Sequence, residues 1–513
     1  MSAPRDAMQH GFMPVFCCST ARHCRLPALA LATLLAGCAA PPPQQPGVTP
    51  RSSAQALLQR SLRDPELARF IATQTGAPQA PTPVWTLRTL SLAALYFHPD
   101  LQVGRAGMEL AEADLQIAQQ RPNPSLQLGL KYGSAAALAA PSPWTVGAAI
   151  GLLLQSRAQR AAHVARAQAG VRAARYMLDA VRWQVRARVQ RAWIGLWAAR
   201  RRLRLQQDTV NTARTLQRHI AARAQAGMDA PLAAALAQRA TQQAAMRLGQ
   251  DRAAQRAARI ALAAAVGVPA AALQRVRLDF SAMDAAPPGV DQATLARLVH
   301  AALQHRDDVR AAWQRVRAAR AALQQAQAAR DGGPPLLAPG AERDQGVDRL
   351  TLGLRLPLPV RNQHQGQIAQ ARARLARRIA QLAQVQAQAL TRVEQAAAAL
   401  HAAAAQERRS ARRVAVDRAL FCAALGARAR GLVGPLQPLR ARLHLLSAQR
   451  AQLQARAAQW QALADLQSAL QQPFLRTAKA ASTVVLGRQQ TAAATALPEI
   501  TGVLRVPGLG EGW

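Results

Sequence analysis

Two stretches of this chain are too long, and too free of proline, to be ordinary globular helices. The first runs from about Arg157 to Arg223 and the second from about Gln365 to Arg430, with only isolated glycines inside. At 1.5 Å per residue, a helix of either length would reach about 100 Å. Helices this long pack as coils or cross membranes, and the dense arginine and glutamine exclude a membrane span. The sequence therefore predicts coiled helices that stand in water.

The composition agrees with long helices, because half of the chain is hydrophobic while only 4% is aromatic. The net charge of +39 comes almost entirely from arginine, and raises nucleic acid as a partner. The arginines are spread over helix faces without interleaved aromatic residues or a nucleic-acid-binding motif, and their near-exclusive use over lysine is typical of coding bias. We therefore expect no nucleic-acid partner.

An internal repeat decides the architecture before any single motif does. Thr145-Val146-Gly147 recurs as Thr351-Leu352-Gly353, about 207 residues later. A second set recurs with the same mutual spacing: Arg223, Gly227, Pro231 and Leu232 match Arg430, Gly434, Pro438 and Leu439. The chain is therefore predicted to contain two copies of one unit.

Each copy is predicted to have the same order of elements. A helix comes first, then two short strands, the long helix, a reversing turn and a shorter helix. The first helices cover Leu87–Gln120, interrupted at Pro99, and Gln292–Arg330; the last cover Leu232–Val266 and Leu439–Gln471. The predicted organisation is a signal peptide (1–37), an N-terminal leash (38–84), the first copy (85–270), a linker (271–291), the second copy (292–472) and a C-terminal tail (473–513).

The predicted strands alternate between apolar and polar residues with a period of two. In Ser125–Tyr132 the leucines share one face while Gln127 and Lys131 lie on the other, and Arg349–Leu358 opposes leucines to Arg349 and Arg355 in the same way. In Thr145–Gln155 the alternation is weaker, because the apolar residues are opposed mainly to small ones. An ordinary half-buried sheet would have this pattern, and so would membrane strands. Membrane strands must close into a barrel, because lipid offers no hydrogen-bond partner to an unpaired backbone group.

The remaining strand of the second copy, Pro335–Gly340, is expected to be short or to start late, because Pro339 lacks a ladder donor. A loop is expected at Gly340–Asp348. Four strands per chain are too few for a barrel, since the smallest membrane barrels have about eight. Two chains would supply eight strands and three would supply twelve, and the sequence does not choose. The helices of several chains would form a tube around a water-filled passage that continues into the barrel.

The N-terminus predicts an exported lipoprotein. Arg22 and Arg25 precede an apolar run, Leu26–Leu35, which is too short to span a bilayer and closes in Leu35-Ala36-Gly37-Cys38. This pattern is typical of a secretory signal cleaved before a lipid-modified cysteine, here Cys38. The Pro/Gln segment Pro41–Pro50 is then expected to be an extended leash.

No residue pattern predicts an enzyme. The sequence has no glycine-rich phosphate loop, nucleophile elbow, paired metal ligands or facing acid–base pair. His300 and His305 lack the cysteine or carboxylate partners of a metal site, so we expect solvated or packed helix residues. Cys422 is expected to be a small buried hydrophobe. The prediction is therefore a chain with no catalytic residue, no metal site and no cofactor.

The order of these elements resembles the TolC-like outer-membrane efflux family over nearly the whole mature chain. The segments that carry the resemblance are His98-Pro99-Asp100-Leu101, Ala111-Glu112-Ala113-Asp114, Arg121-Pro122-Asn123-Pro124, Pro143-Trp144-Thr145-Val146-Gly147, Val266-Gly267-Val268-Pro269, Arg306-Asp307-Asp308-Val309, Leu356-Pro357-Leu358-Pro359 and Gln365–Arg374. The resemblance implies a homotrimer in the outer membrane, a shared twelve-stranded barrel and a periplasmic helical tube. The tube would open when an inner-membrane pump and a periplasmic adaptor dock.

On this basis Lys131, Arg349 and Arg355 are predicted to line the lumen, and Arg223, Gly227, Arg430 and Gly434 to contact the adaptor at two periplasmic tips. The second tip, Arg430–Pro435, is richer in glycine and proline than the family resemblance leads us to expect. The predicted function is passive conduction of a small-molecule or ion cargo through an efflux duct. A non-conducting periplasmic coiled-coil spacer is the alternative, but a spacer would not need leucines alternating with Lys131 or Arg355.

Overall fold

The computed structural model of the protein describes residues 47, 49–76, 84–133, 143–274, 276–285, 287, 292–330, 332–344 and 346–471. The chain divides into two units, Met1–Gln59 and Arg60–Trp513. In the first unit the structure describes one helix, α2 (Pro50–Gln59), which buries no residue. Cys38 and most of the predicted Pro/Gln leash lie outside the described residues.

The second unit contains two copies of one order of elements, as the repeat predicts. The first copy comprises α4 (Leu87–Phe97), α5 (Pro99–Gln119), β2 (Ser125–Tyr132), β3 (Trp144–Leu153), α6 (Arg157–Gln225) and α7 (Pro231–Val266). The second comprises α9 (Gln292–His305), α10 (Asp307–Ala328), β5 (Leu336–Asp344), β6 (Val347–Arg355), α11 (Gln365–Ala429) and α12 (Leu436–Leu470). Both predicted long helices are therefore confirmed.

Short elements precede and join the copies. α3 (Pro65–Thr75) precedes the first copy and buries Leu67 and Ile71, so this part of the expected leash is folded. α8 (Ala270–Gln274), β4 (Arg277–Leu278) and η1 (Ser281–Met283) lie in the expected linker. β4 pairs in parallel with β1 (Val84–Trp85), which ties the linker to the start of the first copy.

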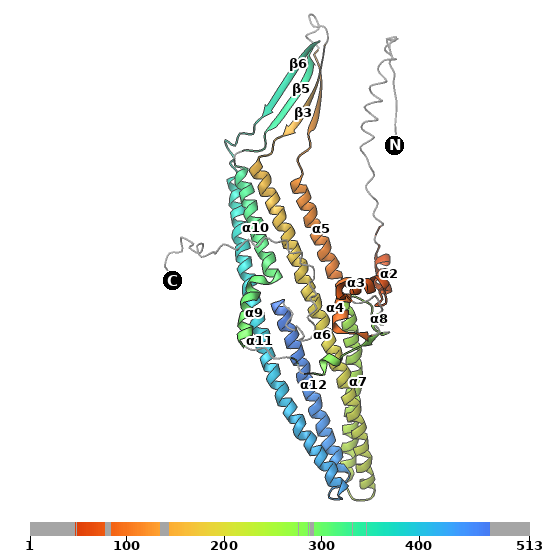
Figure 1. The fold of residues 1–513 in the computed structure, drawn as a ribbon. Coiled ribbons are helices and arrows are strands. Elements are labelled where there is room, and N and C mark those ends of the chain that lie inside the picture. Colours follow the sequence, from red (N-terminus) through yellow and green to blue (C-terminus); the bar gives the residue numbers. More distant parts are fainter. Residues whose placement is uncertain are drawn as a thin grey trace, which may run out of the picture. The chain divides into compact units, whose positions relative to one another are not determined.

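The four longer strands form one antiparallel sheet in the order β2-β3-β5-β6. The helices that enter and leave the sheet follow the same order, since α5 packs on α6, α6 on α10 and α10 on α11. Figure 1 shows the strands beyond one end of these helices and the two reversing turns, α6 to α7 and α11 to α12, at the other end. α5 and α11, with β2 and β6, are therefore the edges of this unit.

The main hydrophobic core lies at mid-height, where both copies meet. Helices α4, α6, α7 and α12 each contribute fully buried side chains, namely Leu90, Trp193, Leu196, Leu262, Leu463 and Leu466. Away from this core the paired helices pack largely through alanine, which lets helix axes approach closely. No helix among the described residues is both long and apolar enough to cross a membrane.

The structure corrects three local predictions. The helix expected over Gln292–Arg330 is two helices, with a break at Arg306 between α9 and α10. The strand expected over Pro335–Gly340 to be short or to start late is β5; it starts one residue late, at Leu336, but it is nine residues long and extends to Asp344 into the expected loop. α12 starts at Leu436 rather than Leu439, with Pro438 in its first turn, where a missing N–H costs no helical bond.

Candidate functional site

The sheet has one apolar and one polar face across all four strands. Its register aligns Leu128 with Ala148, Ala148 with Ala341, and Ala341 with Leu350, so apolar residues line up from edge to edge. The other members of this face are Leu126, Leu130, Tyr132, Trp144, Val146, Ile150, Leu152, Leu337, Pro339, Leu352 and Leu354. Many of these side chains are exposed to solvent. Soluble monomers rarely expose an apolar surface of this extent, so this face marks a contact with lipid or another protein.

The opposite face carries the polar residues Gln127, Lys131, Thr145, Glu342, Asp344, Arg349, Thr351 and Arg355. Thr145 Oγ1 donates a hydrogen bond of 2.6 Å to Asp344 Oδ1, and Arg349 Nη1 lies 2.7 Å from Asp344 Oδ2. Lys131 is aligned with Thr145 at the same end, whereas Arg355 is aligned with Leu336 at the helix end of the sheet. The three predicted lumen residues thus share one face.

Glu342 and Asp344 are polar-face residues that the sequence pattern did not predict. They fall in the segment expected to be a loop, where Pro339 and Arg343 obscure the alternation. Arg343 lies on the apolar face, 3.7 Å from Asp348 across the β5–β6 hairpin. The polar face therefore combines three cations with two carboxylates and is not uniformly positive.

Pro339 is tolerated because the ladder with one neighbour lapses beside it. β3 pairs with β5 from Thr145 to Ala149 and again from Leu152, but not at the two positions between, whereas pairing with β6 continues through Pro339 and Leu352. The next residue must be small, because a Cβ on Gly340 would lie 2.8 Å from Ala148 O and from Ala149 Cβ.

The first reversing turn ends α6 with a left-handed glycine. Gly227 has φ 73°, and the amide of Met228 donates to Arg223 O at 2.9 Å, which satisfies the last helical carbonyls. Arg223 also donates two hydrogen bonds to Asp229, of 2.7 and 3.0 Å. The Arg223 guanidinium lowers the pKa of the Asp229 carboxyl through these bonds.

The second reversing turn has the same backbone conformation as the first, but its left-handed glycine is not the one predicted from the sequence. Its left-handed glycine is Gly431, with φ 74°, and the amide of Leu432 donates to Ala427 O at 2.9 Å. Arg430 is the C-cap of α11, and Gly434 is not left-handed. The pairing of Gly227 with Gly434 by sequence is therefore three residues off. Both turns present exposed apolar side chains, Met228 and Leu232 in the first and Leu432 in the second.

At mid-height the two copies stabilise the same kind of helix junction with different residues. Between α4 and α5, the imidazole Nδ1 of His98 accepts from the amide of Asp100, and Arg60 donates to Phe97 O (2.8 Å) and Gly267 O (3.0 Å). His98 is only 6% exposed, and burial lowers the pKa of its imidazole against the opposing influence of Asp100.

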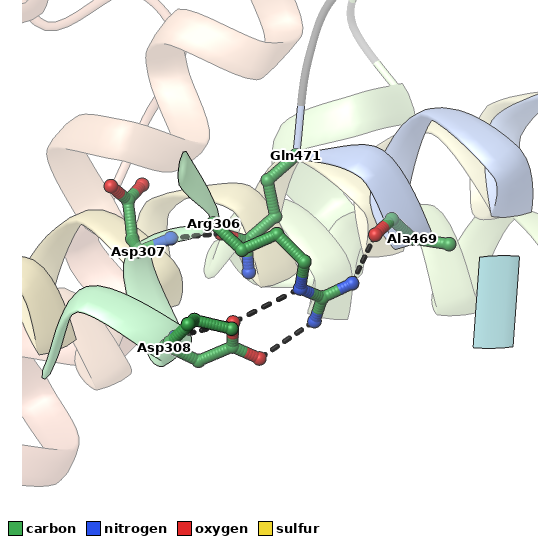
Figure 2. Close-up of polar contacts among 6 residues, drawn as sticks. Arg306, Asp307, Asp308, Ala469 and Gln471 are labelled. Atoms are coloured by element: carbon green, nitrogen blue, oxygen red, sulfur yellow. Dashed lines mark hydrogen bonds and ion pairs between the residues drawn. The ribbon is translucent and has the colours of Figure 1, made fainter. Parts of the chain in front are cut away.

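Between α9 and α10 the arginine belongs to the junction itself (Figure 2). Arg306, 3% exposed, donates two hydrogen bonds to Asp308, of 3.0 and 2.6 Å, and one to Ala469 O at the end of α12. The amide of Asp307 donates to Gln471 Oε1 at 2.7 Å. The local sequence Arg306-Asp307-Asp308-Val309 does not reveal this role, because Ala469 and Gln471 lie far along the chain.

A third polar cluster joins the two helical hairpins. Arg450 of α12 lies 3.1 Å from the buried Asp251 of α7 and donates to Gln206 of α6, while Arg202 of α6 lies 3.5 Å from Asp251. The cluster therefore ties the second copy to α6 and α7 of the first copy.

The structure places the histidines and the cysteine named from the sequence on exposed helix surfaces. His300 and His305 are exposed and contact Gln304 and Arg310. Cys422 is exposed, so the expectation that it is buried is wrong; α11 turns this position away from its partner helices. Among the residues that the structure describes, no group of three His, Cys, Asp or Glu side chains is placed to hold a metal ion.

Comparison with known proteins matches both copies separately. The family model described as outer membrane efflux protein matches residues 90–268 and 298–472. Similar solved structures include the outer membrane protein VceC of Vibrio cholerae (20% identity, 76% of this chain and 97% of that one, TM-score 0.61). The CmeC outer membrane channel of Campylobacter jejuni is also similar (15% identity, 75% of this chain and 85% of that one, TM-score 0.59). So is the open state of the MtrE outer membrane channel of Neisseria gonorrhoeae (18% identity, 75% of this chain and 89% of that one, TM-score 0.59). No curated protein sequence matched. At these identities the structures establish a shared fold.

Proposed function

This chain belongs to the outer membrane efflux protein family, and we propose that three copies form the outer-membrane channel of a tripartite efflux system. Cargo, a small molecule or an ion, passes passively from the periplasmic side to the exterior. A periplasmic adaptor docks on the channel, and an inner-membrane pump supplies the energy for transport. Lipid on Cys38 anchors each copy to the outer membrane.

The two-faced sheet is the observation that carries the proposal. Its apolar face is continuous over four strands, and its polar face carries charged residues on three of them. In the part of the chain that the structure describes, the edge strands β2 and β6 each pair with only one other strand. An unpaired edge cannot face hydrocarbon, because lipid offers no hydrogen bonds. Pairing β2 of one copy with β6 of the next removes every edge, and three copies give twelve strands.

In this arrangement the polar face lines the passage. Lys131 and Arg349 lie near the outer opening with Asp344 and Glu342 among them, while Arg355 lies where the strands meet the helices. Mixed charge of this kind allows ions of either sign to pass a water-filled opening, so the sheet alone does not select a cargo.

The two reversing turns are the proposed docking surface for the adaptor. Arg223 and Gly227 set the shape of the first turn and Arg430 the end of α11 in the second; Gly434 lies just before α12. The exposed Met228 and Leu432 supply apolar area beside these polar groups. Movement of the turns relative to one another strains the Arg450–Asp251 link between the hairpins, so this link limits opening.

The first test is conductance of the purified, detergent-solubilised protein in planar bilayers. We expect ion-conducting pores from particles of trimer mass. Lys131→Glu changes a charge on the polar face, and Arg343→Glu changes one on the apolar face in the neighbouring row of the sheet. The Lys131 variant should shift the reversal potential in a salt gradient toward cation selectivity, whereas the Arg343 variant should leave it unchanged.

A periplasmic coiled-coil spacer is the alternative function. It predicts an oligomer that stays soluble without detergent and never conducts. Pores whose selectivity responds equally to Lys131→Glu and Arg343→Glu would contradict the assignment of the polar face to the passage.

A further inference from the structure

The edge helix α5 has two apolar stripes. One faces α6, since Leu101 and Ala118 are buried and a Cβ on Gly104 would lie 2.9 Å from the side chain of Leu178. The other is exposed: Val103, Leu110 and Ile117 are 73%, 66% and 61% accessible. At about 100° per residue, Val103 lies roughly 200° around the helix from Leu101. A helix that is apolar on two opposite sides is one that packs on two sides.

The exposed stripe of α5 has the spacing of a coiled-coil seam. Val103, Leu110 and Ile117 recur every seven residues, with Ala106 and Ala113 between them at the alternate positions. Two carboxylates flank this seam, Glu109 on one side and Asp114 on the other.

The other edge helix, α11, has the complementary surface in its first third. Six exposed alanines alternate at spacings of four and three: Ala369, Ala373, Ala376, Ala380, Ala383 and Ala387. The buried Ala371 and Ala389 lie on the opposite side, where α11 packs on α10. Arg372 and Arg377 flank the alanine seam.

The two seams match in shape and in charge. Large side chains on α5 face small ones on α11, which permits knobs-into-holes packing. The carboxylates that flank the α5 seam face the guanidiniums that flank the α11 seam. In the part of the chain that the structure describes, Glu109, Asp114, Arg372 and Arg377 form no ion pair, so all four charges remain available to a neighbour.

The direction of the chain also agrees. α5 runs toward the sheet and continues into β2, while α11 leaves the sheet after β6. A contact between the two seams of neighbouring copies is therefore antiparallel, and it brings β2 of one copy beside β6 of the next.

We propose that neighbouring copies assemble by seating the Val103–Leu110–Ile117 seam of α5 on the alanine seam of α11, with Glu109 and Asp114 opposite Arg372 and Arg377. This inference rests on the proposed function, because it assigns the contacts that close the ring. The contact joins two different surfaces, so repeating it with rotation produces a closed ring and not an isolated pair.

Charge exchange on the full-length, detergent-solubilised protein tests the proposal. Glu109→Arg with Asp114→Arg, or Arg372→Glu with Arg377→Glu, places like charges opposite one another. Each pair should raise the monomer fraction, measured by native mass spectrometry, about tenfold. Combining all four substitutions should restore the ring. Glu112→Arg is the control, since Glu112 is exposed on α5 but lies off the seam. Unchanged mass in both charge variants, or no recovery in the combination at normal helical content, would overturn the interface.

Covalent capture gives a second, independent measurement. In a chain carrying Cys422→Ser, Leu110→Cys is combined in turn with Ala373→Cys, Ala376→Cys and Ala380→Cys. Oxidation should link copies into a ladder in at least one combination, and Glu112→Cys with Ala376→Cys should not link. The absence of a ladder in all three combinations refutes the proposed contact.

The outcomes separate this inference from the proposed function. A cross-linked ring that does not conduct would refute the channel and leave the interface standing. Conducting pores without the ladder would refute the interface alone.

Discussion

The first and second copies share their order of elements but stabilise equivalent places with different side chains. At the mid-height junction, the first copy uses His98 together with Arg60 from outside the copy, whereas the second uses its own Arg306. At the reversing turn, the first copy has the Arg223–Asp229 pair, while the segment Gly431–Pro435 of the second has no acidic residue. Helix carbonyls and amides need a partner, and either copy can recruit it from a different part of the chain.

The largest difference is expected from removing the junction arginines. Arg306→Ala leaves the Asp308 carboxylate and the Ala469 carbonyl without their partner in a buried site, and should lower the free energy of unfolding by about 3 kcal/mol. Arg60→Ala removes hydrogen bonds to two carbonyls at a half-buried position, and should cost about 1.5 kcal/mol. Chemical denaturation followed by circular dichroism measures both values.

Arg317→Ala, an exposed arginine on α10, is the control and should stay within about 0.5 kcal/mol of the parent protein. If Arg306→Ala behaved like this control, the two junctions would not depend on their arginines.

Glycine substitutions sharpen the comparison of the two turns. Gly227→Ala and Gly431→Ala place a Cβ in a left-handed conformation, and each should cost about 1 kcal/mol. Gly434→Ala should cost less, because Gly434 is not left-handed and a Cβ there meets nothing within 4 Å. A greater loss of stability in Gly434→Ala than in Gly431→Ala would contradict the observed register and support the pairing of Gly227 with Gly434 that the sequence predicts.

The junctions should also differ in their response to pH. Burial lowers the pKa of His98, so the unfolded chain binds its proton more readily than the folded chain. The stability of the first copy is therefore retained above the ordinary histidine pKa of about 6.5 and falls as the pH drops below it. His98→Asn keeps a capping side chain without a titrating group, and should lose this part of the pH dependence in denaturation measured from pH 7.5 to 5. A parent protein that gains stability on acidification through this range would contradict the assignment.

The smallest effect is expected at the first turn. Asp229→Asn weakens a partly exposed ion pair at the end of the molecule, so the unfolding midpoint should change by less than in the preceding variants. Hydrogen exchange at the amides of residues 224–230 should accelerate several-fold, while those of 428–435 remain as in the parent. Equal acceleration in both turns would mean that the Arg223–Asp229 pair acts beyond its own turn.

Features with a regular period could be predicted from the sequence. β2 has the bounds expected from its alternation, and the predicted start and end of both long helices lie within two residues of those observed. The common face of Lys131, Arg349 and Arg355 follows from the same period of two.

What could not be predicted depends on contacts between distant residues or on small departures from the period. Glu342 and Asp344 were missed because Arg343 and Pro339 interrupt the pattern of β5. The break at Arg306 contains neither proline nor glycine, and its partner Ala469 O is a backbone atom 163 residues away. The register of the turns was misread because the second turn contains two glycines, and the spacing to Pro438 aligned Gly434 rather than Gly431 with Gly227.

The lengths of α6 and α11 bear on how the two copies diverged. α6 has 69 residues and α11 has 65, and the family match likewise begins 208 residues apart and ends 204 apart. Four residues are close to one helical turn, so such a change keeps the apolar seams in line, whereas a change of one or two residues would rotate them by about 100° or 200°. We therefore expect these helices to tolerate insertions and deletions of whole turns. A natural or engineered length variant should keep its seam contacts only when it obeys this rule.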